Sequence, residues 1–377
     1  MNKVTILGAG NAGHALAFEV ASNGGDVMLY EHPDFAKNLA GIKQRGGIEA
    51  VKELEVKGIT VPAMLSGFAK ITQLTTDPQE AIDFADIIVL IVPEFAHIPV
   101  FKLMLPYLRD GQLFITLPGN FASLRFKKML HEAGSKKDLT FVDAGSIPYA
   151  VRIIGPGTIY IEGKKSAFQV GALPAGELVN VMARLQEVLF LRLVPAADTL
   201  LVGLANPNMI MHVATAVLGM GPMESRQGEI QFYAEGCSAA VAKVLEQEDL
   251  ERLAVCAAYG RKTETFLETI NLYYGLQMKN IRDFAKNTPI HNRMPNDSPK
   301  SPCERYISED CPSGLVPVWH FGRLFGIACP TIEAIIRICN IYNDVDYFTV
   351  GVTPEKLGLG GMNAVEIHNY LAEKTSG

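Results

Sequence analysis

The sequence lacks several features that would mark a secreted, membrane-embedded or nucleic-acid-binding protein. Its six cysteines all follow residue 236, and none forms a C-x-x-C pair. We therefore expect reduced thiols, with a disulfide or a metal site as the minor alternative. Apolar runs such as 87–93 are far shorter than the roughly 18 residues that suggest a membrane span. The formal net charge of −6 disfavours nucleic acids and anionic membranes as partners.

The beginning of the chain also lacks a targeting pattern. The first strand is expected at about Lys3, which leaves no room for a secretory signal ahead of the fold. Together with the cysteine pattern, this predicts a cytoplasmic protein. There is no long low-complexity tract and no internal repeat, and 48% of the residues are apolar against 20% charged. These proportions predict a folded chain, and a length of 377 residues predicts two domains.

The first half of the chain alternates strands with helices, in the order typical of βαβ units. The runs have little alternation, so they predict a parallel α/β sheet that is covered on both faces. The stretch 46–65 alternates more, which favours short strands or a hairpin inserted in the sheet. The expected strands are 4–7, 27–30, 74–76, 87–92, 113–117, 139–142 and 158–162, and the expected helices are 11–22, a segment from Pro78, and about 99–108.

The character of the sequence changes after about residue 193. From 196 to about 284 the pattern is helical, and 239–260 has the period of an amphipathic helix. The segment 287–306 is polar and rich in Pro and Asn, which predicts a long loop of functional importance. Helices resume at about 318. We therefore expect a Rossmann-type α/β domain over 1–193 and an all-α domain over 194–377.

A glycine-rich turn follows the first expected strand. Gly8, Gly10 and Gly13 form the pattern G-x-G-x-x-G between a strand and a helix, with Asn11 and Ala12 at the helix start. The first glycine permits a tight turn, the second lets the backbone approach a pyrophosphate, and the third lets the helix pack closely on the strand. The amides at the helix N-terminus then face the phosphates. This pattern predicts a dinucleotide site, with a purely structural turn as the alternative.

Three further positions complete the expected cofactor site. Glu31 ends the second strand, where a carboxylate reads the ribose 2′-hydroxyl and repels a 2′-phosphate. We therefore expect NAD(H), with NADP less favoured. Pro93 and Pro118 follow two later strands, and ligands in such sheets bind beyond the carboxyl ends of the strands. We expect both turns to line the nicotinamide side, although ordinary turns would have the same composition.

Three stretches in the second half carry residues suited to proton chemistry. The segment 206–212, NPNMIMH, places His212 in an apolar helix, where a buried histidine of the core is the ordinary alternative. The segment 232–253 places acids beside the aromatic turn FYAEG. The segment 304–317 gathers Arg305, Asp310 and several turn residues directly after the expected loop.

Together these stretches resemble the opine dehydrogenases. The elements that carry the resemblance are GAGNAG at 8–13, IPYAVR at 147–152, the pattern from Asn206 to His212, FYAEG with DLER at 232–252, and RYISEDCPSGLVP at 305–317. Their order and spacing are similar to the family over nearly the whole chain. The resemblance implies reductive condensation of a 2-oxo acid with an amino acid, through an imine that NADH reduces.

The resemblance also implies roles for individual residues. His212 and Asp310 match the family's acid–base pair, in which the carboxylate orients the imidazole and stabilises its charged form. Arg305 would hold a substrate carboxylate in a bidentate pairing. A structural ion pair of Arg305 with Glu309 or Asp310 is the alternative.

Some positions depart from the family pattern. Asp143 stands where a Glu is expected, and Val213 follows His212 in place of Pro. Asp143 is expected to read the cationic end of the amino-acid substrate, but a shorter acid would reach it differently. Tyr149 and Arg152 are expected near the domain junction, with core packing and a surface ion pair as alternatives.

Two other functions remain open from the residues alone. A hydroxyacid or glycerol-phosphate dehydrogenase of the same two-domain plan would use a helical lysine, for which Lys243 and Lys262 are the candidates. A non-catalytic NAD(H) sensor would keep only the cofactor turn. Among the remaining histidines, His97 is expected at the surface, and His291 and His320 lack metal-site spacing, so we expect no bound metal. A homodimer is possible for the apolar helical domain.

Overall fold

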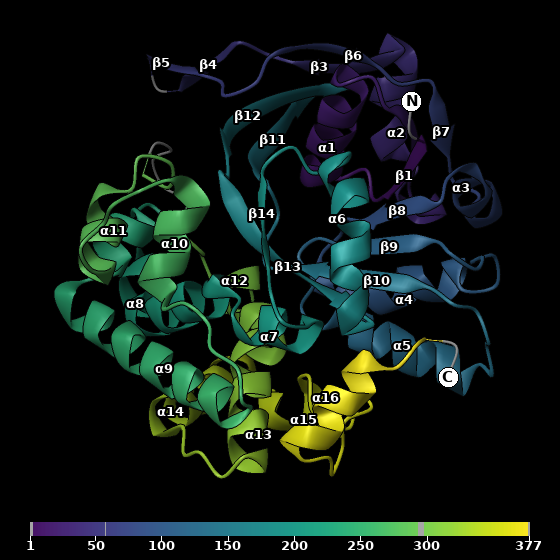
Figure 1. The fold of residues 1–377 in the computed structure, drawn as a ribbon. Helices are drawn as coiled ribbons and strands as arrows, with labels where there is room; N and C mark the ends of the chain where they lie inside the picture. Colours follow the sequence, from purple (N-terminus) through teal and green to yellow (C-terminus); the bar gives the residue numbers. More distant parts are fainter. Residues whose placement is uncertain (1–2, 57, 293–297, 376–377) are drawn as a thin grey trace. The chain divides into compact units, whose positions relative to one another are not determined.

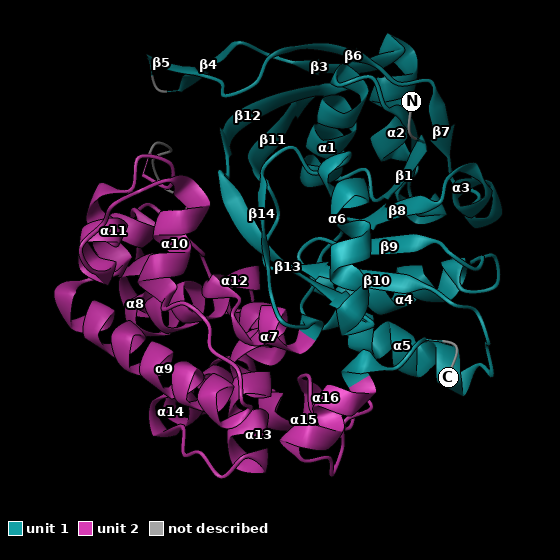
Figure 2. Ribbon diagram, viewed as in Figure 1, with its two compact units in different colours: residues 1–199, 371–377 teal, residues 200–370 magenta. Residues whose placement is uncertain are grey.

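The computed structural model describes residues 3–56, 58–292 and 298–375. The chain forms two compact units, Met1–Thr199 with Leu371–Gly377 and Leu200–Tyr370 (Figure 2). The division expected between residues 193 and 194 falls inside strand β14 (Arg192–Pro195), which pairs with β13 (Ala167–Leu173) in unit 1. The boundary therefore lies after residue 199, and the end of the chain returns to unit 1.

An eight-stranded sheet forms the centre of unit 1, in the order β14-β13-β10-β9-β8-β1-β2-β7. Its strands pair in parallel, except that β13 is antiparallel to β10. This confirms the Rossmann-type sheet. The remaining strands of this sheet are β1 (Lys3–Leu7), β2 (Asp26–Tyr30), β7 (Gln73–Thr75), β8 (Ile87–Leu90), β9 (Leu113–Thr116) and β10 (Thr140–Ala144).

A second sheet contains the strand expected at 158–162, which was wrongly assigned to the main sheet. Its order is β11-β12-β3-β6, and β4 and β5 form a separate two-stranded hairpin (Figure 1). Every residue of β12 before Lys164 is buried, as in the strands of the main sheet. Its apolar composition therefore does not distinguish the two sheets. The strands are β3 (Gly47–Ala50), β4 (Glu53–Val56), β5 (Ile59–Pro62), β6 (Gly67–Lys70), β11 (Tyr149–Gly155) and β12 (Thr158–Lys164).

Aromatic packing fixes the helices that follow β8 and β9. Phe101 of α4 stacks on Phe126 of α5 with ring centroids 4.0 Å apart, and both lie edge-on to Phe114 of β9 at 5.5 Å. Such pairs contribute about 0.5–1.5 kcal/mol each beyond the area that they bury. The helices of unit 1 are α1 (Asn11–Ser22), α2 (Lys37–Arg45), α3 (Pro78–Phe84), α4 (Glu94–Met104), α5 (Ala122–Glu132) and α6 (Leu178–Gln186), with short 3₁₀ turns at Pro33–Phe35 and Ala175–Glu177.

Unit 2 is helical throughout the residues that the structure describes, which confirms the all-α expectation. Three of its segments, η3, η4 and η5, are single π-helical turns. Its elements are α7 (Thr199–Leu204), η3 (Met209–Val213), α8 (Ala214–Ser225), η4 (Phe232–Gly236), α9 (Ala239–Ala258), α10 (Phe266–Tyr274), α11 (Ile281–Asn287), α12 (Arg305–Ser308), η5 (Cys311–Leu315), α13 (Val316–Leu324), α14 (Pro330–Asn343), α15 (Tyr347–Val350) and α16 (Ala364–Ala372).

The acids of the DLER motif hold helices together rather than lining a site. Asp249 accepts a hydrogen bond from Arg252 at 2.8 Å and another from the backbone of Phe266 at 2.8 Å. Glu251 accepts from the first two free amides of α14, each at 3.0 Å, which stabilises that helix through its N-terminal partial charge. These contacts fix α9 against α10 and α14.

The helical stretch Thr199–Ser225 is long and apolar enough to cross a membrane, but 89% of its most apolar window is buried inside the protein. It is longer than any apolar run expected from the sequence. Its burial is that of a core helix of unit 2, where it carries η3. The six cysteines are free thiols, as expected.

Candidate functional site

The three glycines of the cofactor turn have three different surroundings. Gly8 has a positive φ of 114°, and a Cβ there would stand 2.5 Å from Val92. A Cβ on Gly13 would stand 1.8 Å from the carbonyl oxygen of Gly8. Around Gly10, in contrast, no described atom lies within 4 Å of the Cβ position. The first and third glycines therefore shape the turn, and the second leaves open space where a pyrophosphate fits.

The N-terminus of α1 is suited to bind an anion. In the described part of the chain, no side chain caps its first amides, and its first turn carries no acid. The amides and the positive end of the helix dipole thus remain available for phosphate oxygens. The glycine turn and the helix together fit a dinucleotide cofactor.

Glu31 lies at the end of β2 beside this turn. Its carboxylate accepts hydrogen bonds from the backbone of Ala9 at 3.0 Å, the backbone of His32 at 2.8 Å, and the Asn38 side chain at 3.0 Å. The group is 8% exposed. A carboxylate has about four acceptor positions, so three bonds leave one for a ribose hydroxyl. Glu31 therefore holds the turn, and its contact with a ribose stays a prediction.

Asn11 and Ala12 begin α1, as expected for residues at the cofactor turn. The Asn11 side chain, however, accepts a hydrogen bond from the backbone of Ile153 in β11 at 2.7 Å. Its carboxamide oxygen thus links α1 to the second sheet. The expected contact with the cofactor then depends on the backbone amides of Asn11 and Ala12.

The turns with Pro93 and Pro118 follow β8 and β9, as expected. Pro93 is the residue before α4, whose Glu94 forms an ion pair with Arg125 of α5. Pro118 follows a cis peptide bond. Both turns lie at the carboxyl ends of their strands, on the side of the sheet where α1 begins.

Asp143 is fully buried at the end of β10. It accepts hydrogen bonds from the Ser123 hydroxyl at 2.7 Å and from the Ser123 amide at 3.2 Å. A Cβ on Gly119 would stand 2.3 Å from the Asp143 Cβ. Burial raises the pKa of Asp143 to about 7, against the opposing effect of the Ser123 bonds. The arrangement fixes the turn that contains Pro118, and contact of Asp143 with substrate stays a prediction.

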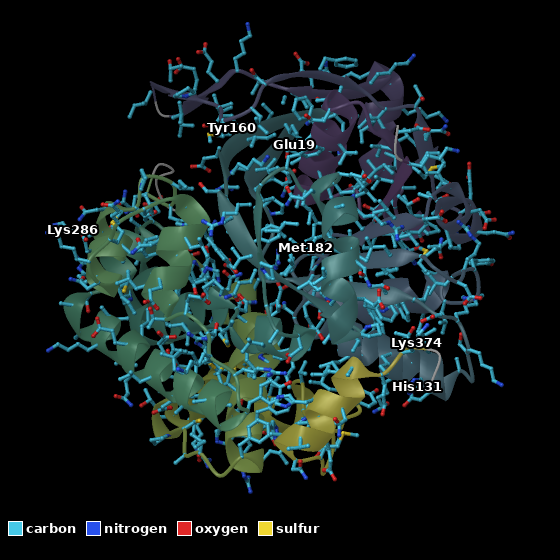
Figure 3. The ribbon with its side chains drawn as sticks, viewed as in Figure 1. Glu19, His131, Tyr160, Met182, Lys286 and Lys374 are labelled. Carbon is cyan, nitrogen blue, oxygen red and sulfur yellow. The ribbon has the colours of Figure 1, made fainter. Side chains whose placement is uncertain are left out.

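Tyr149 is also buried, in β11. Its hydroxyl donates to Glu19 of α1 at 2.5 Å, and Lys164 forms an ion pair with the same carboxylate. Glu19 is labelled in Figure 3. Burial and the nearby Glu19 charge raise the pKa of Tyr149. The contact ties the second sheet to the cofactor helix within unit 1.

His97 was expected at the surface, and this was wrong, because it is completely buried. Helix α4 begins at Glu94 rather than near Pro99, which turns His97 toward the core. Burial lowers its pKa to about 3, so the ring is neutral. The two candidates for a helical lysine are placed differently. Lys243 is exposed on α9, whereas Lys262 lies outside the helices, so its expected helical position was wrong.

In unit 2, two of the π-helical turns bring together the expected acid–base pair. His212 lies in η3 and Asp310 directly precedes η5, 98 residues later. His212 Nδ1 and Asp310 Oδ2 are 2.8 Å apart. The side chains are 18% and 13% exposed. Isolated π-helical turns often occur at functional sites, since the extra residue re-aims side chains.

The environment of the pair suits proton transfer. Burial raises the pKa of Asp310, and the hydrogen bond and charge of His212 oppose this. With Asp310 ionised, Nδ1 carries the proton and Nε2 becomes the reactive atom. The ring is packed edge-on by Tyr306 at 4.8 Å and by Phe232 at 6.0 Å. These two rings therefore help to fix the orientation of the imidazole.

A close backbone approach sets the distance between the two partners. A Cβ on Gly314 of η5 would stand 2.5 Å from the Cβ of Met209 in η3. Only glycine lets these two segments pack so closely. From the sequence, Gly314 is expected only as one of the turn residues in 304–317, because its contact with Met209 spans 105 positions of the chain.

Arg305 is exposed on α12 and forms an ion pair with Glu309 through Nε. The expected alternative of a structural pair is thus present, but it occupies only one edge of the guanidinium. The Arg305 side chain as a whole is 69% exposed. Glu309, which is buried, orients the fork and was missed as a site residue. A second missed residue, Tyr233, has its hydroxyl 3.1 Å from His212 Nε2.

A Rossmann-type unit with a dinucleotide turn, joined to a helical unit with a His–Asp pair, defines a nicotinamide-dependent oxidoreductase. Family models agree with this division. Residues 3–135 match the N-terminus of NAD-dependent glycerol-3-phosphate dehydrogenase, and residues 195–343 match the α-helical domain of NAD/NADP octopine/nopaline dehydrogenase. The first match concerns the cofactor half, and the second separates the chain from the glycerol-phosphate enzymes.

The chain belongs to the opine dehydrogenase family and is an NAD-dependent oxidoreductase of the class that acts on CH–NH groups. It is 30% identical to an opine dehydrogenase of Arthrobacter sp. (strain 1C), over 97% of this chain and 98% of that protein. Octopine dehydrogenase with NADH and L-arginine has a similar fold, with a TM-score of 0.76, 20% identity, and coverage of 97% and 98%. Yersinopine dehydrogenase with NADP⁺ bound has a TM-score of 0.69, 15% identity, and coverage of 99% and 98%.

Proposed function

We propose that this protein condenses a 2-oxo acid, with pyruvate as the first candidate, with the amino group of an L-amino acid to form an opine. The neutral amine adds to the oxo carbon, and the carbinolamine, which keeps one nitrogen proton, loses water to give a protonated imine. NADH supplies the hydride that reduces this cation to a secondary amine. The balance requires one added proton, which leaves with the carbonyl oxygen as water.

The His212–Asp310 pair is the observation that carries the proposal. An imidazole backed by a carboxylate donates and accepts a proton near neutral pH, and this is the step that carbinolamine breakdown requires. In the reductive direction His212 would begin protonated and end neutral, while Asp310 stays ionised and holds the ring. The oxidative direction reverses the transfer and should prefer a more alkaline pH.

Arg305 is proposed to hold the carboxylate of the 2-oxo acid. Its Nε is engaged by Glu309, and its Nη groups can form two parallel hydrogen bonds to a carboxylate. The pairing would place the oxo carbon at a constant position, which is the main requirement for a reaction between two small molecules.

For the cofactor, we propose a preference for NAD(H) over NADP(H). Glu31 is 8% exposed and accepts three hydrogen bonds beside the turn, which leaves a negative charge where a 2′-phosphate would lie. The relative with bound NADP⁺ makes this a property to measure in this chain.

The test is NADH oxidation with pyruvate against a panel of single L-amino acids, each with a control that lacks the amine. Consumption that needs both partners, with a secondary-amine product by mass spectrometry, supports the proposal and names the amine. Oxidation with the oxo acid alone indicates a hydroxyacid dehydrogenase. Binding of NADH without turnover on a panel that also varies the oxo acid indicates a nucleotide sensor.

A further inference from the structure

The reactive nitrogen of His212 is already engaged within unit 2. Its Nε2 lies 3.1 Å from the hydroxyl of Tyr233, while Nδ1 lies 2.8 Å from Asp310. An imidazole nitrogen presents either one lone pair or one N–H, in a single direction in the ring plane. The group that occupies this direction is therefore the group to which a proton can pass. In this protein it is a phenol.

Tyr233 is held firmly in this position. Its π-helical turn is fixed by Arg282, which donates to the carbonyls of Ala234 at 2.8 Å and Cys237 at 2.6 Å. The Tyr233 ring stacks on His291 with centroids 4.4 Å apart and an interplanar angle of 17°. The ring is also edge-on to Phe284 at 6.1 Å. A tyrosine clamped by backbone and ring contacts keeps its hydroxyl at one place.

Aromatic rings also contact the His212 imidazole. Tyr306 and Phe232 lie edge-on to it, and these two rings are themselves 4.4 Å apart. His212 and Tyr233 are both partly buried, and 18% of the His212 side chain is exposed. Hydrogen bonds thus link Asp310, His212 and Tyr233 in series.

We propose that Tyr233 is the catalytic residue that passes the proton between His212 and the substrate. This inference rests on the proposed function. In the reductive direction the phenol proton moves to the carbinolamine hydroxyl, whose C–O bond breaks as water leaves and C=N forms. At the same time the proton on His212 Nε2 moves to the Tyr233 oxygen. His212 ends neutral, Tyr233 ends as a phenol, and Asp310 stays ionised throughout.

The phenol suits this step chemically. A phenol has an ordinary pKa of about 10, so it is protonated near neutral pH. It becomes an effective donor only if its oxygen receives a proton at the same moment, and the imidazolium of His212 supplies that proton. The two residues therefore act as a unit, and removal of either one should interrupt the same transfer.

The first experiment compares Tyr233→Phe with Tyr274→Phe. Both changes remove one hydroxyl from the same aromatic region, and the Tyr274 ring contacts His291 at 5.2 Å without being part of the series. We expect Tyr233→Phe to lower kcat/KM for opine formation at least about a hundredfold, with NADH affinity and melting temperature unchanged. Tyr274→Phe should retain wild-type turnover.

The second experiment separates proton transfer from a structural role. Replacing Tyr233 with a fluorinated tyrosine lowers the pKa of the phenol without removing its hydroxyl. The turnover number for opine formation should then change in step with the number of fluorine atoms on the ring, which a merely structural hydroxyl would not cause. A turnover number that does not respond to fluorination, or a Tyr233→Phe enzyme with near-normal turnover, overturns the inference. If His212→Ala is inactive in that case, the proposed function stands and His212 acts directly. A wild-type enzyme that forms no opine from any pair of 2-oxo acid and amino acid would rule out both the role of Tyr233 and the proposed function.

Discussion

The two units of this protein build their sites in opposite ways. In unit 1 the cofactor turn is made by backbone and by the absence of side chains, within residues 8–13 and with Glu31 nearby. In unit 2 the proposed reactive groups are side chains from three π-helical regions, and His212 and Asp310 are 98 residues apart. A backbone site needs only a local pattern, whereas a side-chain site needs the tertiary packing of the whole unit.

This difference predicts that lesions in the two units have separable effects. Changes in the turn should weaken cofactor binding and leave the chemistry intact in the bound complex. Changes in unit 2 should lower turnover and leave cofactor binding intact. Measuring turnover and cofactor affinity in the same variant tests whether the two kinds of effect separate.

The largest effect is expected from His212→Ala. Loss of a general acid–base residue lowers turnover by at least about a hundredfold, and NADH affinity should stay at its wild-type value because the turn lies in the other unit. The measurements are kcat by NADH oxidation and Kd by NADH fluorescence. His320→Ala is the control, since His320 bonds only the carbonyl of Phe348, at 2.9 Å, among the contacts described. Near-normal turnover in His212→Ala would remove the acid–base assignment.

The next effect is expected from Gly314→Ala, which tests how packing sets the catalytic distance. The added Cβ would stand 2.5 Å from that of Met209, so η5 must move away from η3. Overpacking of this kind costs about 1–3 kcal/mol of unfolding free energy. A displacement of about 1 Å between reacting groups can cost about a hundredfold in rate.

The control for this substitution is Gly221→Ala in α8 of the same unit. No described atom lies within 4 Å of its Cβ position, so the protein should keep its stability and its kcat. Thermal unfolding and kcat are measured for both variants. If Gly314→Ala matches Gly221→Ala in both, the close approach of η5 and η3 does not determine the His212–Asp310 geometry.

Much of unit 1 could be predicted from sequence, because its signals are local. The glycine turn, the position of Glu31 at a strand end and the parallel sheet are all indicated by hydrophobic periodicity and glycine spacing over short stretches of sequence. The misplaced strand β12 shows the limit: a fully buried strand has the same composition in either sheet, and only pairing with β3 and β11 distinguishes them. The depth of His97 was missed for a related reason, because the start of α4 was placed several residues too late.

Unit 2 was predictable only where a resemblance identified its residues. His212 in an apolar helix reads as a core residue until Asp310 is placed beside it. The π-helical turns, the Gly314 approach and the Tyr233 hydroxyl depend on contacts between segments distant in the chain, which leave no periodic signal. The ion pair of Arg305 with Glu309 was one of the alternatives that the sequence allowed, and its i,i+4 spacing is the usual signature of an ion pair on a helix.

In unit 1, Gly10→Ala should weaken cofactor binding without a loss of stability. Its Cβ meets only open space in the protein, but it would occupy the position of the pyrophosphate. We expect Kd for NADH to rise at least about tenfold, or about 1.4 kcal/mol, with an unchanged melting temperature. Gly13→Ala is the contrast, because a Cβ there stands 1.8 Å from Gly8 and should lower the melting temperature too. Equal stability losses in both variants would contradict the separate roles of the glycines.

A smaller effect is expected from Arg305→Lys. Lysine keeps the charge but cannot form two parallel hydrogen bonds with a carboxylate. KM for the 2-oxo acid should rise about tenfold, with kcat nearly unchanged. Arg337→Lys is the matched control, since Arg337 also pairs with an acid four positions away and is similarly exposed, at 65% against 69%. A KM change for the amino acid instead of the oxo acid would reassign the carboxylate that Arg305 binds.

The smallest effect on activity, but a distinct effect on stability, is expected from Asp143→Asn. The pKa of Asp143 is raised to about 7 in the folded protein, so the folded state keeps its proton at a pH where the unfolded chain has lost it. The unfolding free energy therefore falls as pH rises from about 4 to about 7, by at most about 1.4 kcal/mol per pH unit. Above that range the contribution of Asp143 no longer changes with pH.

The asparagine variant has no such proton, so its unfolding free energy should lose this part of the pH dependence. Its amide oxygen can still accept from Ser123, which keeps the turn in place. Ser123→Ala acts in the other direction, because removal of the hydroxyl bond raises the pKa of Asp143 further and extends the loss of stability above pH 7. Denaturant unfolding across this pH range measures both variants. Identical pH profiles for wild type and Asp143→Asn would mean that the buried carboxyl is already ionised, and hence that unit 1 holds a charge close to its cofactor turn.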